Sequence, residues 1–265
     1  GISSLRGVFV SHPDEDHMNG VLELMENGEE WGITAEQLFL PAIRESERRE
    51  TFEQLLAAAE DAGIPVSYIK CGDEIRDSQL RLLCLHPEEN TTLADANAYS
   101  ECFYVEVFAK KMKQEAIDDR KANDASGASA IGKISILLTG DVEGEGERQL
   151  TQKLQALQES QSLQESRSLQ ESRSLQESQS LQLTRRLQEQ RGQRKFRVDI
   201  LKVAHHGSGY STGTEFLTTA SPATAIISCG RNNSYGHPHV ETLQRLEDAR
   251  VPWYGTMDYG ALTVN

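Results

Sequence analysis

Short apolar runs and longer amphipathic stretches take turns along this chain. The apolar runs end at turn residues, which is typical of buried β-strands. They predict strands at residues 5–10, 37–41, 65–70, 80–85, 102–109, 134–139, 200–204 and 225–228. The amphipathic stretches predict helices over 19–30 and 44–62, and a third from Glu145 onward. Strands that alternate with helices in this way favour an α/β sandwich with the helices outside two sheets.

The helix predicted over 44–62 illustrates the pattern. Phe52 and Leu55 recur at helical spacing, and Gly63 follows the last turn, as expected where a helix ends. By contrast, residues 114–132 are rich in charged residues, Ala, Ser and Gly. We expect a mobile loop there, because such a segment has little apolar surface to bury.

Residues 157–181 form a nearly perfect six-residue repeat in which Leu opens each copy. On a helix, successive Leu of such a repeat are about 240° apart, so they spread over three faces and build no apolar stripe. A coiled coil would need heptads. We therefore expect one domain over 1–265, with 157–181 as a low-complexity insert that prolongs the helix from Glu145 as an exposed, frayed helix. An oligomerisation arm is the alternative, and the oligomeric state stays open.

Composition limits the choice of partners. The net charge of the 265-residue chain is −14, with 41 acidic and 27 basic residues. This balance opposes a broad nucleic-acid-binding surface, because neutralising phosphates needs Lys and Arg. No apolar run approaches the roughly 18 residues of a transmembrane helix, so we expect a soluble domain. The four cysteines form no C-x-x-C pair, which indicates reduced or buried thiols rather than a structural zinc site.

The segment 11–17, Ser-His-Pro-Asp-Glu-Asp-His, directly follows the first predicted strand. Imidazole nitrogens and carboxylate oxygens suit zinc or manganese. Alternation directs His12, Asp14 and Asp16 to one side, with His17 beside them, which is too many ligands for one tetrahedral ion and fits half of a pair. Asp16 acting only as a helix cap is the alternative, but it leaves the other His and Asp side chains unexplained.

Polar residues also end two later strands. Asp141 follows the strand at 134–139, where its carboxylate could bridge two ions or cap the next helix. His205 and His206 end the strand at 200–204. One of the two is expected to face the site, and His205 is the preferred one.

The residues after these histidines favour anion binding. Gly207 and Gly209 leave room for backbone N–H groups to approach a ligand. Ser208 and the neighbouring amides are therefore expected to hold a phosphate or an oxyanion.

The segment His12 to His17 resembles the HxHxDH signature of the metallo-β-lactamase superfamily, with Asp14 where the second His usually stands. This HxDxDH variant resembles the soluble domain of ComEC-type proteins, which take part in DNA uptake during bacterial competence. Three later segments strengthen the resemblance, namely LTGD at 138–141, DILKVAHHGS at 199–208 and NSYGHPH at 233–239. Together with the first motif they cover nearly the whole chain outside the repeat.

The resemblance implies an αββα metallo-β-lactamase-like sandwich with its site at one edge, between the sheets. It also implies further strands before residue 12, so this chain, which begins with Gly1, is expected to lack its N-terminal strands. The implied cofactors are two divalent metal ions, Mn or Zn. The expected ligands are Asp16, His17 and His237 for one ion and His12 and Asp14 for the other, with Asp141 between them.

Further residues are candidates through the same resemblance. His86 and Asn97 lie near the place where another ligand of the His12 and Asp14 ion would stand. His86 facing solvent is the alternative. His239 is expected either beside His237 or on the surface.

The function that the resemblance implies is that of a binuclear metal-dependent hydrolase, a phosphodiesterase or nuclease that acts on DNA, preferably single-stranded, during uptake. Asp16, Asp141 and His205 would be catalytic, and His206 and Ser208 would bind substrate. The full-length protein would carry a membrane channel domain and be attached to the bacterial cytoplasmic membrane. Two alternatives stay open: a hydrolase of small esters or lactones, and a non-catalytic, metal-stabilised module that binds DNA or a partner.

Overall fold

The structure, a computed structural model, describes residues 2–89, 91–93, 95–108, 133–175 and 198–263. The loop expected at 114–132 and the later copies of the repeat lie outside the described residues. Among the described residues, no helix is both long and apolar enough to cross a bilayer. The four cysteines are free thiols, and Cys84 and Cys102 are buried, in agreement with the expectation from their spacing.

A small parallel sheet carries the N-terminal part of the chain. Its order is β2 (Val8–Phe9), β4 (Leu38–Pro41) and β5 (Val66–Ile69). The helices α1 (Glu15–Asn27) and α2 (Glu50–Asp61) cover one face. A separate two-stranded parallel sheet pairs β1 (Ser4–Leu5) with β3 (Thr34–Ala35). The apolar side chains between the small sheet and its helices form one core, which includes the fully buried Met18, Leu38, Leu40, Phe52 and Leu55.

A seven-stranded mixed sheet carries the rest of the chain. Its order is β12 (Trp253–Gly255), β11 (Thr224–Ile227), β10 (Ile200–Lys202), β9 (Lys133–Leu138), β8 (Cys102–Phe108), β7 (Leu80–His86) and β6 (Glu74–Arg76). Strands β12 to β9 pair in parallel, and β9 to β6 pair antiparallel. The outer face is covered by α3 (Gly144–Leu175), α5 (Thr214–Ala220) and α6 (Val240–Asp248).

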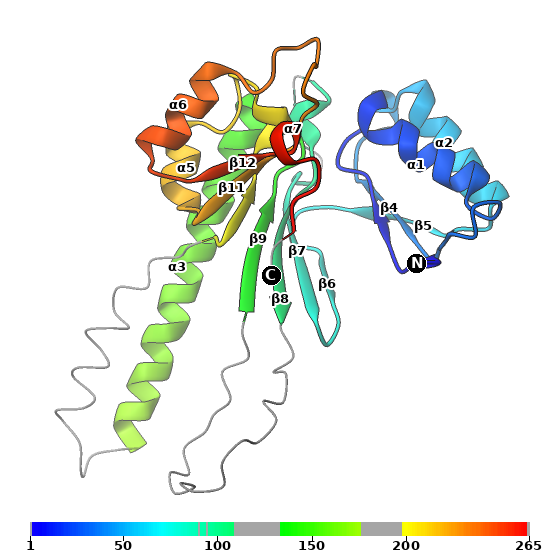
Figure 1. The fold of residues 1–265 in the computed structure, drawn as a ribbon. Coiled ribbons are helices and arrows are strands. Elements are labelled where there is room, and N and C mark those ends of the chain that lie inside the picture. The colour runs from blue at the N-terminus through cyan, green and yellow to red at the C-terminus, as the bar shows by residue number, and fades with distance from the viewer. Residues whose placement is uncertain (1, 90, 94, 109–132, 176–197, 264–265) are drawn as a thin grey trace, which may run out of the picture.

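The two sheets face each other across a layer of aromatic and aliphatic side chains. Phe9 of β2 stacks on Phe39 of β4 with ring centroids 4.5 Å apart. Phe9 also meets Phe103 of β8 edge-on, with centroids 5.4 Å apart. Ile69 and Cys84 belong to the same buried layer. The order of layers is therefore helix, sheet, sheet, helix, which confirms the predicted α/β fold class and its αββα arrangement (Figure 1).

Helix α1 begins earlier than its apolar pattern predicts. The structure starts it at Glu15 rather than at residue 19, and Asp14 occupies the cap position without a side-chain capping bond. Acidic residues in the first turn interact favourably with the helix dipole. The consequence is that Asp16 and His17 project from a helix and not from an irregular turn, while His12 and Asp14 precede the helix.

Helix α2 begins later than predicted, at Glu50 instead of Arg44. A short 3-10 turn at Glu45–Glu47 precedes it. The buried residues of α2 start at Phe52, and nothing before that position supplies an apolar face. Helices gain most of their stability from burying such a face.

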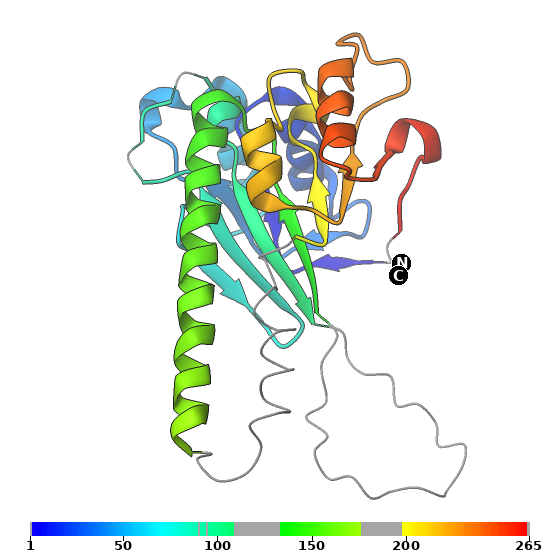
Figure 2. The same cartoon turned by 90° about the vertical axis from the view of Figure 1, so that its left-hand side faces the viewer.

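Helix α3 continues from the core into the repeat. Leu150 and Leu154 are fully buried, Leu157 is partly buried against the same core, and Leu163 is 61% exposed. Gln158 Nε2 donates a 2.7 Å hydrogen bond to the Thr219 carbonyl. Figure 2 shows the helix running along the large sheet and continuing beyond its end. The first residues of the repeat thus contact the core, and the described residues after them remain helical.

Candidate metal centre

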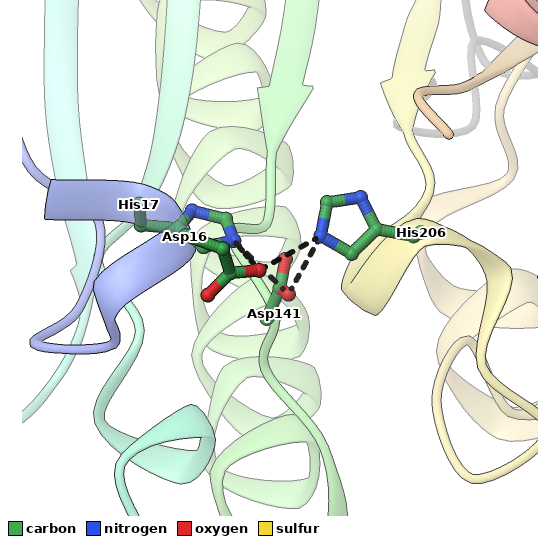
Figure 3. Close-up of side chains that lie close together, drawn as sticks. All are labelled: Asp16, His17, Asp141 and His206. Atoms are coloured by element: carbon green, nitrogen blue, oxygen red, sulfur yellow. Dashed lines mark hydrogen bonds and ion pairs between the residues drawn. The ribbon is translucent and has the colours of Figure 1, made fainter. Parts of the chain in front are cut away.

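Four side chains from three distant segments meet at one edge of the two sheets. Asp16 and His17 lie in the first turn of α1. Asp141 follows β9, and His206 lies in the 3-10 turn η3 (Ala204–Gly207) after β10. One candidate ligand atom from each residue lies within 4.8 Å of those of the other three. Figure 3 shows the two imidazoles on either side of the two carboxylates. We call these four residues the Asp141 cluster.

Asp141 is the centre of this cluster and is only 2% exposed. Its Oδ2 lies 3.2 Å from His17 Nε2 and 3.2 Å from His206 Nε2. Its Oδ1 lies 3.2 Å from the Lys202 ammonium. Burial alone would raise the pKa of Asp141, but the hydrogen bonds from His17 and His206 and the charge of Lys202 hold that pKa below its usual range. The carboxylate is therefore ionised and available to a cation.

The turn before Asp141 admits only glycine. Gly140 has φ +50°, and a Cβ at this position would lie 2.8 Å from Ser100 Cβ. Ser100 Oγ accepts the Asp141 N–H at 2.9 Å, and Lys202 Nζ donates to the Gly140 carbonyl at 2.7 Å. These contacts hold the turn from both sides, so the direction of the Asp141 side chain is determined by tight packing.

The hydrogen bonds of the two imidazoles leave the same ring atom for a metal ion. His206 Nδ1 lies 2.6 Å from the Ser228 carbonyl. A carbonyl only accepts, so Nδ1 carries a proton and Nε2 is the atom left for an ion. Ser11 Oγ lies 3.1 Å from His17 Nδ1 and engages that atom, so Nε2 is left for an ion in His17 as well. The hydrogen bond with Asp141 raises the pKa of His206, so an ion that binds Nε2 must displace a proton.

His12 and Asp14, expected as ligands of the other ion, lie beside the Asp141 cluster. The His12 ring is 4.2 Å from the His17 ring, and Ser11 Oγ lies 3.1 Å from His12 Nδ1. His12 Nε2 is 3.7 Å from Asp14 Oδ2. His12 is 1% exposed, and burial lowers its pKa to about 4. Asp14 also forms an ion pair with Arg49, and burial raises the pKa of Asp14 although Arg49 partly lowers it.

His205 pairs with Glu143 and is not part of the Asp141 cluster. His205 and its neighbour His206 have φ values of 46° and 55°, and their ring centroids are 6.2 Å apart with an angle of 67° between the planes. His205 Nδ1 lies 2.9 Å from Glu143 Oε2. This hydrogen bond raises the pKa of His205 and lowers that of Glu143. The structure thus brings His206 into the Asp141 cluster, whereas sequence reasoning preferred His205 for the residue that faces the site.

His237, expected as a ligand, lies near the cluster without joining it. Its ring is 5.5 Å from that of His205 and 6.2 Å from that of His206. The pKa of His237 is lowered mainly by burial and to a smaller extent by the nearby His239. His239 accepts the Gly209 N–H on Nδ1 at 2.8 Å, so it ties two loops together.

Two of the other candidates, Ser208 and His86, are buried. Ser208, expected to bind substrate, is 3% exposed, and its Oγ accepts the Tyr210 N–H at 3.3 Å. His86 is fully buried outside the Asp141 cluster, with Nδ1 3.0 Å from the Ser100 carbonyl. Burial lowers the pKa of His86. Asn97 begins a 3-10 turn, and its side chain hydrogen-bonds Glu143.

Among the residues that contact candidate site residues, sequence reasoning missed Ser11, Arg49, Glu143 and Lys202. A signal existed only for Lys202, which is a charged residue within the apolar strand β10 and so needed a partner inside the fold. Ser11 and Glu143 are common polar residues beside a motif, and their sequence positions do not distinguish them from solvent-exposed ones.

A known protein is similar to this chain over nearly its whole length. Across 264 residues, or 98% of its length, the chain is 27% identical to ComE operon protein 3 of Bacillus subtilis. The chain resembles the ComEC-type proteins. It spans only 25% of the length of this ComEC-type relative.

Two other comparisons cover less of the chain. It is 38% identical over 69 residues to Recombination protein 2 of Haemophilus influenzae, covering 26% of this chain and 9% of that protein. A metallo-β-lactamase from Staphylococcus aureus aligns with 57% of this chain and 44% of its own, at 11% identity and a TM-score of 0.24. No protein-family model matches the chain.

Proposed function

We propose that this chain is a metal-dependent hydrolase domain that cleaves phosphodiester bonds in DNA, preferably single-stranded DNA, during uptake in competence. The observation that carries the proposal is the Asp141 cluster, in which two carboxylates and two imidazoles converge from three distant segments. Such a donor set suits zinc or manganese. The similarity to ComE operon protein 3 supports the competence setting.

Two sets of ligands support a pair of ions. Asp16, His17, Asp141 and His206 would hold one ion, and His12 with Asp14 would begin the site of the other. When bound, divalent ions at such a site polarise a phosphoryl or carbonyl oxygen and supply a water nucleophile at neutral pH. The second set offers only two donors at 3.7 Å, so we propose that it is the weaker of the two.

His205 is proposed to handle the proton of the leaving oxygen. Glu143 fixes its Nδ1 and raises its pKa, so the imidazole holds a proton at a pH where an isolated His would release it. His237 lies 5.5 Å away and is proposed to bind the substrate or to complete an ion site. Ser208 is buried, so its role in substrate binding is proposed to be indirect. Its Oγ accepts the Tyr210 N–H and so holds the loop around Tyr210.

The longer protein is proposed to place this domain beside a membrane channel. This rests on the similarity to a relative of which the chain spans 25%.

Residues 157–181 are proposed to be an insert within a single domain. Because Leu157 and Gln158 contact the core, deleting residues 163–181 should leave the unfolding temperature unchanged, whereas deleting 157–181 should lower the stability by about 1 kcal/mol. A large loss of stability on deleting residues 163–181 would contradict the proposal that the repeat is an insert.

A hydrolase of small esters is the second candidate, because a net charge of −14 disfavours long polyanionic substrates. A non-catalytic module that binds DNA or a partner is the third. Assays with an aryl ester and a lactone, run beside the DNA assays, separate the first alternative from the proposal.

The deciding experiment compares two single substitutions in the first turn of α1. Purified protein is reconstituted with Mn or Zn and incubated with labelled single- and double-stranded DNA. Asp16→Ala should abolish cleavage and lower the metal content. Glu15→Ala removes the same charge from the exposed neighbour and should retain both. A wild type that binds metal but cleaves only the small ester would move the function to the second candidate, and one that binds DNA without cleaving any substrate would favour the third.

A further inference from the structure

Two strongly exposed tyrosines lie in the loops that follow β10 and β11. Tyr210 is 85% exposed and Tyr235 is 77% exposed. Within the described part of the chain, neither hydroxyl has a hydrogen-bond partner. Tyr210 follows the HHGS turn that carries His206. Tyr235 lies in the loop between β11 and α6, and Figure 1 shows this loop beyond the C-terminal ends of the parallel strands β10 and β11. Exposed aromatic rings beside a candidate active site often mark a binding surface.

The two tyrosine-bearing loops are linked to each other. His239 accepts the Gly209 N–H on Nδ1 at 2.8 Å, and its Nε2 lies 3.1 Å from the Tyr235 carbonyl. One neutral tautomer makes both bonds, because Nδ1 accepts and Nε2 donates. The Asn233 side chain also bonds both the N–H and the carbonyl of His237. These hydrogen bonds already hold the two loops in place, so little conformational entropy is lost when a ligand binds.

Tyr235 is also connected to the candidate ligands through a row of nearly parallel rings. Its ring lies 5.8 Å from that of His237, with an angle of 22° between the planes. The His237 ring in turn lies 6.2 Å from that of His206, at 18°. The tyrosine is therefore two ring contacts from the Asp141 cluster, close enough for adjoining parts of one ligand to reach both.

We propose that Tyr210 and Tyr235 form a stacking platform for the unpaired bases of single-stranded DNA whose backbone lies at the Asp141 cluster. This deepens the proposed function and rests on it. Bases of a duplex are stacked on each other and offer no free face, whereas bases of a single strand can lie on an aromatic ring. A platform also reconciles a DNA substrate with a net charge of −14, because stacking does not depend on neutralising phosphates.

The test measures binding without cleavage. The full chain is kept in EDTA, and the anisotropy of a labelled oligothymidylate of about twelve nucleotides is followed. Tyr210→Ala and Tyr235→Ala should each weaken binding on the order of tenfold, as expected for the loss of one stacked base. The matched Phe variants keep the ring and should retain most of the affinity. Trp31→Ala, an equally drastic change at a 50% exposed aromatic residue beyond the far end of α1, should have no effect.

Two further probes identify the part of the DNA that is bound. A third variant carries both Tyr210→Ala and Tyr235→Ala. An abasic strand of the same length keeps the phosphates but has no bases to stack. Its affinity for the wild type should therefore be as low as the affinity of the normal strand for the double variant. A duplex should bind no better than the abasic strand. Equal affinity for the abasic and normal strands, or Ala variants that bind like the wild type, would overturn the platform.

Cleavage measured after metal is restored separates the two proposals. A wild type that cleaves DNA but whose binding ignores both tyrosines refutes the platform alone. A wild type that neither binds nor cleaves DNA refutes the proposed function together with the platform.

Discussion

The two halves of the segment at residues 12–17 lie in different surroundings. Asp16 and His17 project from α1 toward Asp141, which holds both neighbouring imidazoles at 3.2 Å. His12 and Asp14 precede the helix, and their closest candidate ligand atoms are 3.7 Å apart. Asp14 is also engaged by Arg49. A histidine and an aspartate of the first half thus belong to a cluster of four candidate ligands. The histidine and the aspartate of the second half form only a pair.

This difference arises from where the other ligands come from. The first half receives Asp141 and His206 from the ends of β9 and β10, whereas the second half receives an arginine. Asp141 and Asp14 are each paired with a cationic side chain, Lys202 and Arg49. The two halves therefore differ in the number of converging donors, which is four in the first half and two in the second, and a larger set of donors binds a cation more tightly. We therefore expect two ion sites of unequal affinity, and the following experiments test that inequality.

The largest effect is expected for Asp141→Ala compared with Asp14→Ala. Loss of Asp141 removes the carboxylate between His17 and His206, which is also proposed to lie between the two ions, so both ions and all cleavage should be lost. Loss of Asp14 should remove only the weaker ion. Metal analysis after dialysis measures ions per chain for each variant. Equal losses in the two variants would show that the sites are not unequal.

Ser11→Ala should weaken both sites together, because Ser11 Oγ contacts Nδ1 of both His12 and His17 at 3.1 Å. Losing such an outer contact typically lowers metal affinity about 10- to 100-fold. Competition with a chelating dye gives the affinities. Ser228→Ala is the control, since Ser228 binds His206 through its backbone carbonyl, which the substitution keeps. Unchanged affinities in Ser11→Ala would contradict the role of this hydroxyl.

Acid should destabilise the metal-free protein through His12. Its folded pKa of about 4 lies below the unfolded value of about 6.5, so the unfolded chain binds the proton first as pH falls. This histidine alone should therefore cost about 2 kcal/mol of stability between pH 7 and pH 5. Urea unfolding of the metal-free wild type and of His12→Asn measures the difference. The variant should lose less stability over this range, and equal losses would refute the low pKa.

The smallest effect is expected for Arg49→Ala. Removing the guanidinium frees Asp14, so the weaker ion should bind roughly twofold to fivefold more tightly, in keeping with the modest strength of an exposed ion pair. Titration with Mn measures this change. Arg6→Ala, which breaks an exposed pair with Asp77, is the control. Weaker binding in Arg49→Ala would show that Arg49 supports the site.

Much of the fold follows from local pattern. The runs at Leu38–Pro41 and Leu80–His86 form strands close to their predicted bounds, because short apolar segments between turn residues bury best as strands. The start of α1 was misplaced by four residues, from residue 19 to Glu15. Periodicity detects the apolar face of a helix, whereas its polar first turn carries no such signal.

The candidate site was predictable in its residue types but not in its grouping. The sequence by itself determined that His and Asp residues follow the first strand, β9 and β10, and that alternating strands and helices form a layered α/β fold. Only the tertiary structure decided that His206 reaches Asp141 while His205 reaches Glu143, from two successive residues that both have positive φ. It also decided that Lys202, Ser11 and Glu143 contact candidate site residues. Such contacts join residues as many as 62 positions apart, and local sequence carries no information about distances across a fold.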